Sequence, residues 1–321
     1  MLMKKIRLAL LAGGISSERS VSLNSGNQVF DALDKQKYDI VRYDPKTDLK
    51  QLVMDAPDID AALIILHGPF GEDGTVQGLL DLLDIPYQGA GVLGSAVAMN
   101  KLLSKRLYQG ADIPTPDFRS IAANDDIDIP GLVQELSLPL VVKPACAGSS
   151  VGMTIVKDAS AMDQALEDGF AHDDTLIVEA YVKGIELTCG VLGNENLEAL
   201  PVIEIIPGQG HDYFDFNAKY VAGETEEICP ARIDDDLTRR VQELAVRSHQ
   251  ALFLKGYSRT DMMLAGKDLF VLETNTIPGM TATSLYPQSA AAAGYSFSRL
   301  LDSLIQLAME EHKNKNKRRG Q

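Results

Sequence analysis

Residues 259–275, RTDMMLAGKDLFVLETN, predict a β-hairpin whose arms carry acidic and amide side chains. The arms are RTDMML and LFVLETN, and AGKD between them has the length of a hairpin turn. Pairing across this turn puts Asp261 roughly opposite Glu273, and strand alternation puts Glu273 and Asn275 on one face. Two carboxylates that close repel each other unless a cation lies between them. The hairpin therefore predicts a cation site at the end of an apolar element.

The ligands that this hairpin offers are all oxygens. Oxygen ligands without sulfur or imidazole suit Mg²⁺, with water and phosphate completing the coordination shell. Arg259 lies two residues before Asp261 and so shares its strand face, where it could bind a phosphate or stabilise an oxyanion. The alternative is a structural ion pair between Arg259 and one acid, and spacing alone favours neither interpretation.

The first third of the chain alternates strand and helix patterns. IRLALLA (6–12) and AALIILHG (61–68) have the apolar character of buried parallel strands, and helical segments separate the predicted strands. This rhythm predicts an α/β domain with a parallel sheet and helices on both faces. Such sheets bind ligands beyond the carboxyl ends of their strands, which here are GGISSERS (13–20) and HGPFGEDG (67–74).

The remaining chain is a mixture of strands and helices. A helix is expected near 92–109, a proline-containing linker after it, and a middle segment of three strands and one helix up to residue 184. Beyond it we expect two strands, a polar loop at 212–227 that could close over a site, a helix around 234–253, the hairpin, and a last helix ending near 311. The terminal KNKNKRRGQ is most simply a solvated, disordered tail.

Composition narrows the function classes. The 321 residues include 30 Lys plus Arg and 45 Asp plus Glu, a formal charge of −15. Nucleic-acid binding needs a basic footprint, so we expect no nucleic-acid partner, whereas a nucleotide site stays open. No apolar run approaches the roughly 20 residues of a membrane helix, so we expect no membrane association. Three cysteines without CxxC spacing indicate a reducing compartment and no disulfide framework.

A glycine- and serine-rich turn follows a predicted strand in VVKPACAGSSVGM (141–153). Backbone N–H groups of such turns can cradle phosphate, and Lys143 just before the turn favours that interpretation. The segment is not a P-loop, since it lacks GxxxxGK[ST], and a flexible hairpin turn is the alternative. Glu179 and Glu186, which flank AYVKGI, would be unremarkable when taken singly.

Three further side chains have both a structural and a functional interpretation. Glu18, at a predicted helix start, either favours the helix dipole or anchors a substrate ammonium group. His67 ends a parallel strand, where ligand sites lie, although a lone histidine is more often structural. Lys101 sits beside Lys105 and Arg106 on a predicted helix, so a solvated face is the default interpretation for it.

Six segments taken in order resemble the D-alanine–D-alanine ligase family of the ATP-grasp superfamily, over nearly the whole chain. They are GGISSERSVSLNSG, HGPFGEDGTVQGLLDLLDIPYQGAGVLGSAVAMNK, KPACAGSSVGM, FDFNAKY, SRTDMM and ETNTIPGMTATSL. The resemblance implies a cytoplasmic enzyme of peptidoglycan precursor synthesis. ATP would phosphorylate one D-alanine carboxylate, and the amine of a second D-alanine would attack the acyl phosphate.

The resemblance also implies an organisation and a set of small-molecule partners. A Rossmann-like domain at 1–96 would precede the central (97–184) and C-terminal (185–312) parts of an ATP-grasp fold, with ATP held between those two parts, and a basic tail at 313–321. The partners would be ATP, D-alanine and two Mg²⁺ ions, with Mn²⁺ as a substitute, and the protein would be a homodimer.

Residue roles follow from the same resemblance. Toward the amino acids, Glu18 would anchor the ammonium group of the first D-alanine and His67 would lie near its carboxylate. Ser149 and Tyr220 would join Glu18 in an orienting network, and Arg259 and the Gly279 N–H would face the oxyanion. Ser284 and Leu285 would contact the second D-alanine. Toward ATP, Lys101, Lys143 and Lys219 would contact the phosphates. Glu179 and Val182 would contact the adenine, and Glu186 the ribose. Asp261, Glu273 and Asn275 would hold the magnesium ions.

The chain departs from the family pattern at three positions. Ala180 stands where many members have lysine after the glutamate, Phe216 where a second tyrosine is frequent, and Thr283 where histidine is common. A sister ligase that uses D-lactate or D-serine is the nearest rival, but such enzymes commonly carry a histidine in place of the loop that holds Tyr220. Other ATP-grasp ligases and a nucleotide-binding protein without catalysis are the remaining rivals. A Rossmann dehydrogenase is excluded, since no GxGxxG follows the first strand.

Overall fold

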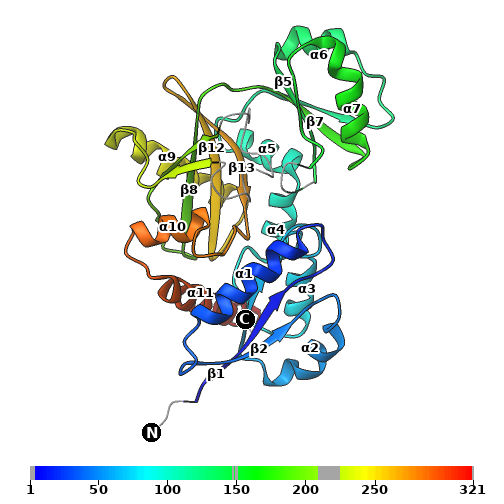
Figure 1. The fold of residues 1–321 in the computed structure, drawn as a ribbon. Helices are drawn as coiled ribbons and strands as arrows, with labels where there is room; N and C mark the ends of the chain where they lie inside the picture. The colour runs from blue at the N-terminus through cyan, green and yellow to red at the C-terminus, as the bar shows by residue number, and fades with distance from the viewer. Residues whose placement is uncertain (1–3, 147, 149–150, 209–224, 320–321) are drawn as a thin grey trace.

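The computed structural model describes residues 4–146, 148, 151–208 and 225–319. One three-stranded parallel sheet is followed along the chain by two antiparallel sheets (Figure 1). The mixed α/β class expected from the sequence is therefore confirmed. In the part of the chain that is described, no helix has the length and apolar character needed to cross a membrane.

The N-terminal sheet has the strand order β2–β1–β3, all parallel. Its elements are β1 (Ile6–Ala12), α1 (Arg19–Ala32), β2 (Tyr38–Tyr43), α2 (Leu49–Asp55), the short 3-10 helix η1 (Ala56–Asp58), β3 (Ala61–Ile65) and α3 (Thr75–Leu82). Every residue of β3 is buried, as expected of a strand covered on both faces. The segments that follow β1 and β3 therefore lie at one edge of this sheet.

Two helices, not one, connect this sheet to the central one. The single helix predicted near 92–109 is wrong, because α4 (Gly91–Met99) ends at Asn100 and α5 (Lys101–Gly110) begins after it. Asn100 has φ −92° and ψ 100°, and its side-chain oxygen accepts a hydrogen bond from Leu103 N at 3.0 Å. An asparagine cap of this kind satisfies one free N–H of a new helix. Lys101 is consequently the first residue of α5.

The central sheet is antiparallel, in the order β4–β7–β5–β6. Its elements are β4 (Phe118–Ala122), α6 (Ile129–Leu136), β5 (Leu140–Pro144), β6 (Thr154–Val156), the 3-10 helix η2 (Ala159–Ala161), α7 (Met162–Phe170) and β7 (Thr175–Ala180). Val142 and Val178 pack into a core with α6 and α7. Strand alternation therefore turns Lys143 and Glu179 toward the opposite face.

The C-terminal sheet is also antiparallel, in the order β11–β10–β8–β12–β13, with β9 beside β8. Its elements are β8 (Ile185–Leu192), β9 (Glu198–Ala199), β10 (Ile203–Pro207), β11 (Thr225–Ile228), α9 (Asp235–Ala251), β12 (Tyr257–Ala265), β13 (Asp268–Asn275) and α10 (Leu285–Ala292). Leu187 and Val191 of β8 share a core with α9, whereas Gly190 between them lies against Tyr286 of α10. The two helices therefore cover opposite faces of the sheet.

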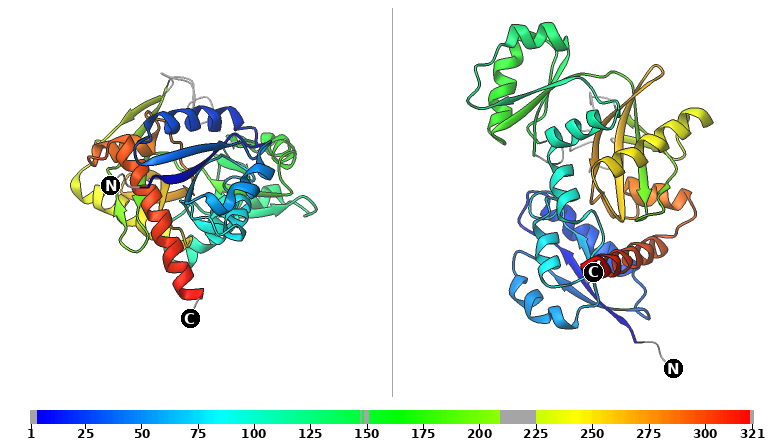
Figure 2. Two further views of the ribbon diagram at one scale, coloured as in Figure 1. Left: turned by 90° about the horizontal axis from the view of Figure 1, so that it is seen from below. Right: turned by 180° about the vertical axis from the view of Figure 1, so that it is seen from behind.

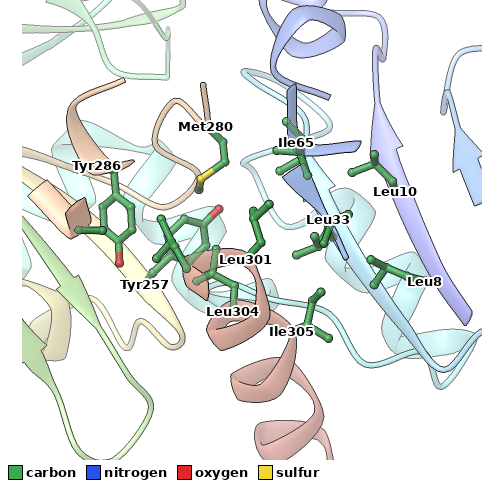
Figure 3. Packing of buried hydrophobic residues seen from close by; sticks show 14 of the residues in the cluster. Leu8, Leu10, Leu33, Ile65, Tyr257, Met280, Tyr286, Leu301, Leu304 and Ile305 are labelled. Atoms are coloured by element: carbon green, nitrogen blue, oxygen red, sulfur yellow. The ribbon is translucent and has the colours of Figure 1, made fainter. Parts of the chain in front are cut away.

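The last helix, α11 (Phe297–Arg319), returns to the N-terminal sheet (Figure 2). Leu301 and Leu304 lie between strand residues such as Leu8 and the aromatic ring of Tyr257, so a single core joins the two ends of the chain (Figure 3). The helix continues through Arg319, beyond residue 312 where the sequence predicted a disordered tail. Two contacts with α3 and the residues after it accompany this extension: Lys315 Nζ lies 2.5 Å from Asp81 Oδ1, and His312 Nε2 lies 3.3 Å from Asp84 Oδ1.

Candidate active site

Two neighbouring cavities contain most of the predicted site residues that the structure describes. The large cavity, about 460 Å³, is lined by Glu18, His67, Arg259, Asn275, Gly279, Ser284 and Leu285, among others. The small cavity, about 120 Å³, is lined by Lys143, Glu179, Val182, Glu186 and Asp261, among others. Lys101 and Glu273 line both. The cavities therefore share a wall, which includes a lysine and a glutamate.

The large cavity begins at the carboxyl edge of the parallel sheet. Glu18 precedes α1, His67 follows β3, and both are buried. Burial is the main cause that lowers the pKa of His67, and the nearby Glu18 carboxylate opposes it. His67 Nε2 has no hydrogen-bond partner among the described residues. An orphaned buried nitrogen beside a buried carboxylate is characteristic of a site that receives a polar ligand.

Glu72 is a large-cavity residue that the sequence interpretation did not single out. Its Oε2 accepts a hydrogen bond from Gly68 N at 2.6 Å. Burial, followed by repulsion from Glu18, raises the pKa of Glu72 to about 8. Its only sequence signal is membership of HGPFGEDG, the segment after β3. Four glutamates line the cavity (Glu18, Glu72, Glu227 and Glu273), and Glu72 is favoured in its neutral form near neutral pH.

The predicted position of Asp261 opposite Glu273 is confirmed. Asp261 pairs with Glu273 and Arg259 with Asn275. Arg259 donates two hydrogen bonds to Asp261, at 2.9 and 2.7 Å, and Asn275 Nδ2 donates to Asp261 Oδ2 at 3.0 Å. Thr188 Oγ1 donates to Asp261 Oδ1 at 2.6 Å. The ion pair that the sequence left as an alternative is therefore present, and Arg259 also lines the large cavity.

A β-bulge next to Asp261 shapes the wall between the cavities. Asp261 pairs with Glu273 but Met262 pairs with Val271, so Leu272 is an extra residue on β13. Leu272 and Glu273 both line the small cavity as a result. The described residues contain no cluster of three or more His, Cys, Asp or Glu side chains placed as metal ligands. What the hairpin does offer is two carboxylates and one amide.

Charged side chains line the small cavity, and one further lysine contacts them from behind its wall. Lys143 Nζ lies 2.6 Å from Glu179 Oε1, and Lys105 Nζ lies 2.7 Å from Glu179 Oε2. Lys101 Nζ, at the shared wall, lies 3.6 Å from Glu273 Oε2. Lys105 was expected on a solvated helix face, but its side chain is fully buried. Its spacing of four residues from Lys101 was the only available signal, and that spacing alone does not indicate burial.

The far side of the large cavity is the turn before α10. Ser284 Oγ accepts a hydrogen bond from Thr281 N at 3.1 Å and lies 2.7 Å from Thr281 Oγ1. A Cβ built on Gly279 would lie 3.0 Å from Ser284 Oγ, so a side chain there would crowd the hydroxyl. Leu285 is buried at the start of α10. The turn thus presents the Ser284 hydroxyl and the Gly279 backbone at the cavity.

Three predicted site residues, Ser149, Lys219 and Tyr220, lie outside the described residues. Phe216, one of the departures from the family pattern, also lies outside them. The other two departures from the family pattern are described. Ala180 lines the small cavity, and Thr283 lines the large one. Gly148, next to Ser149 in the chain, also lines the large cavity.

Comparison with known proteins gives one consistent result. Family models described as D-ala D-ala ligase N-terminus and C-terminus match residues 44–90 and 107–306. A D-alanine–D-alanine ligase of Syntrophobacter fumaroxidans is 58% identical over 308 residues, which are 96% of this chain and 99% of that one. The corresponding enzyme of Desulfotalea psychrophila is 53% identical over 319 residues, covering 97% and 98%.

A solved structure agrees with these relatives. The D-alanine–D-alanine ligase of Bacillus anthracis, crystallised with ATP, is 37% identical and superposes with a TM-score of 0.85, covering 97% of this chain and 99% of that one. The two relatives and the solved structure match this chain over nearly its full length, and the family models match two segments within it. The chain belongs to the D-alanine–D-alanine ligase family.

Proposed function

We propose that the two cavities are the amino-acid and nucleotide halves of one active site, at which ATP drives the joining of two D-alanine molecules. The observation that carries this proposal is the shared wall, where Lys101 and Glu273 line both cavities. A phosphoryl group can pass between two substrates only if their reacting ends meet, so a common wall is the arrangement that this reaction needs.

The large cavity would bind the amino acids. Glu18 is the anchor for the ammonium group of the first D-alanine, and the unpartnered Nε2 of His67 faces its carboxylate end. Ser284 and Leu285 bind the second D-alanine, with the Ser284 hydroxyl on its carboxylate. Ser149 and Tyr220 complete the orienting network with Glu18. Their support is the family resemblance and, for Ser149, the position of Gly148, where an added Cβ would lie 3.1 Å from Glu18 Oε2.

The small cavity would bind ATP. Glu179 and Val182 contact the adenine and Glu186 the ribose, which suits a cavity with apolar walls and a few charged groups. Lys101, Lys143 and Lys219 contact the phosphates. Lys101 supports this assignment because it stands at the wall where the terminal phosphate would meet the amino acid.

Magnesium fits the residues of the hairpin. Asp261, Glu273 and Asn275 supply hard oxygen donors without sulfur or imidazole, and they converge on one face of β12 and β13. These residues would hold two Mg²⁺ ions, or Mn²⁺ in their place. When bound, the ions would neutralise charge on the phosphates.

The reaction proceeds in two steps. The carboxylate of the first D-alanine attacks the γ-phosphorus of ATP, and ADP leaves, which gives an acyl phosphate. The amine of the second D-alanine then attacks the acyl carbon, and the tetrahedral intermediate loses a proton from nitrogen and expels phosphate. Arg259 and the Gly279 N–H stabilise the negative oxygen of that intermediate, since both line the large cavity.

The first experiment measures ADP release with Mg-ATP and D-alanine and identifies the product by mass. D-Alanyl-D-alanine that forms only when both substrates are present is the expected result. ADP release without dipeptide would favour D-lactate or D-serine as the second substrate. Folded protein that releases no ADP would overturn the proposal in favour of a nucleotide-binding protein without catalysis.

We also infer a homodimer from the family resemblance. The chain has a mass of 34.8 kDa, so sedimentation equilibrium separates a monomer from a dimer directly. A mass equal to that of one chain across the concentrations used in the activity assay would contradict the inference.

A further inference from the structure

Lys105 is a fully buried lysine that lines neither cavity. It projects from α5, and its Nζ lies 2.7 Å from Glu179 Oε2 and 2.7 Å from Thr115 Oγ1. The ammonium group also faces the ring of Phe118, whose centroid lies 5.2 Å from Nζ. A buried ammonium group is costly unless it is paired, and here a carboxylate and a hydroxyl group are its partners.

The partner of Lys105 is the carboxylate that faces the small cavity. Glu179 receives one ammonium group on each oxygen, Lys143 on Oε1 and Lys105 on Oε2. Burial alone would favour the neutral acid, yet the two lysines together lower the pKa of Glu179. Burial lowers the pKa of Lys105 to about 8 in turn, and the Glu179 charge opposes that shift. Lys105 and Glu179 thus hold each other in their charged forms.

The two lysines are not equivalent. Lys143 lines the small cavity, at the end of β5, where our proposed function gives it a phosphate of ATP. A lysine drawn toward phosphate contributes less to Glu179. Lys105 does not line the small cavity, so a ligand there would leave its contact with Glu179 available.

We propose that Lys105 is the positioning residue that keeps Glu179 a hydrogen-bond acceptor, and that it thereby makes the small cavity select 6-aminopurine over 6-oxopurine nucleotides. This inference rests on the proposed function, which puts the adenine against Glu179. A carboxylate accepts a hydrogen bond from the 6-amino group of adenine. The 6-oxo group of hypoxanthine presents an acceptor to that carboxylate, and two acceptors repel. A protonated Glu179 would instead donate to the 6-oxo group.

The test compares ATP with inosine triphosphate, which differs from ATP only in the 6-oxo group and the adjacent ring N–H. In the wild type, kcat/KM should be higher for ATP. In Lys105→Met, which keeps the length and removes the charge, kcat/KM for ATP should fall about 10- to 100-fold because a charged hydrogen bond is lost. The ratio of kcat/KM for ATP to kcat/KM for inosine triphosphate should fall by a similar factor, while KM for D-alanine stays unchanged.

Two matched variants separate selectivity from folding. Thr115→Val removes the other partner of Lys105 Nζ but keeps the charge, so it should retain the wild-type ratio. Lys105→Gln keeps a donor without charge and should lose selectivity as Lys105→Met does, which keeps the test available if the methionine variant does not fold. The double variant Lys105→Met with Glu179→Gln should be no less selective than Glu179→Gln alone, since the two residues act as a unit.

Equal losses of kcat/KM for both nucleotides in the Lys105 variants would overturn the inference and leave a purely structural ion pair. A wild type that uses both nucleotides equally would overturn it as well, while the ligase function would stand. Wild-type protein that forms no dipeptide with ATP would instead be a failure of the proposed function.

Discussion

Glu273 is the side chain on which most of the proposed chemistry depends. It lines both cavities, and Lys101 Nζ lies 3.6 Å from its Oε2. The bulge at Leu272 brings Glu273 opposite Asp261, since the register next to the turn would place Leu272 there. The turn itself predicted only that the two carboxylates lie near each other, because a short turn fixes the register of the residues next to it. A local rule of this kind needs no knowledge of the rest of the fold.

Glu273→Gln should lower kcat by about 100- to 1000-fold, the usual loss when a group that stabilises transition-state charge is removed. The variant keeps the shape of the side chain, so its urea unfolding midpoint should stay close to that of the wild type. Asp268→Asn, at the exposed other end of β13, is the matched control and should retain full turnover. Near-normal turnover of Glu273→Gln would remove this residue from the proposed metal site.

Glu72→Gln should stabilise the protein increasingly as pH rises. The wild-type carboxyl has a pKa of about 8 when folded and 4.5 as its ordinary value, so the folded state retains a proton that the unfolded state loses. Wild-type stability therefore falls from about pH 4.5 upward and levels off above about pH 8, whereas glutamine does not titrate. Thermal unfolding across this range should show Tm of the variant rising relative to the wild type by a few degrees. A constant difference would contradict the assigned environment.

The burial of Lys105 was not predicted from the sequence. A lysine near two other basic residues on a helix is usually solvated, and the sequence offers nothing against that interpretation. Its burial depends on Glu179 and Thr115, which come from other segments and meet it only after the chain has folded. The same holds for Glu72, whose neighbour Glu18 belongs to a different loop.

At the scale of elements, the long apolar strands were predicted, whereas short elements and helix ends were not. The central part has four strands and the helices α6 and α7, so the predicted three strands and one helix are wrong, and β9 and β11 were not predicted. Apolar runs and alternation identify β3, β12 and β13 because each strand pattern is short and self-contained. The division between α4 and α5 was missed because the helical pattern continues across Asn100. The bulge at Leu272 was also missed, since it is defined by pairing with β12 and not by the sequence of β13.

Asn100→Ala should cost about 0.5–2 kcal/mol of unfolding free energy, because it removes the cap of α5. It should also raise KM for ATP, since Lys101 is the next residue and belongs to the shared wall. Asp234→Ala removes a cap of the same kind from α9, where Asp234 Oδ1 accepts from Leu237 N at 2.8 Å. This control should lose similar stability in urea unfolding without a change in KM. Equal KM values in the two variants would contradict the role assigned to the helix boundary.

At the scale of the whole molecule, α11 joins the first and last parts of the chain. Its buried face belongs to one core with β1, β3 and α10, as Figure 3 shows. The sequence predicted the helix but not its packing partner, because long-range packing leaves no local pattern. The division of the chain into domains stays a prediction for the same reason.

Leu301→Ala should destabilise the protein by about 2–5 kcal/mol, the usual cost of truncating a fully buried leucine. Because that leucine lies in the core that joins the two ends, unfolding should remain a single transition when followed by both circular dichroism and tyrosine fluorescence. Met309→Ala, on the exposed side of the same helix, should change stability by no more than about 0.5 kcal/mol. Two separate transitions in the wild type would show that the ends unfold independently.

The wall shared by the two cavities has a thermodynamic consequence. A charge placed in one cavity acts on Lys101 and Glu273, and through them on the energy of whatever occupies the other. In the proposed assignment of the two cavities, the two ligands are therefore linked, and linkage is reciprocal: the factor by which nucleotide changes the affinity for amino acid equals the factor by which amino acid changes the affinity for nucleotide. A dissociation constant measured for either ligand alone is thus a property of a half-filled site, and only the pair of constants, with and without the other ligand, describes the enzyme at work.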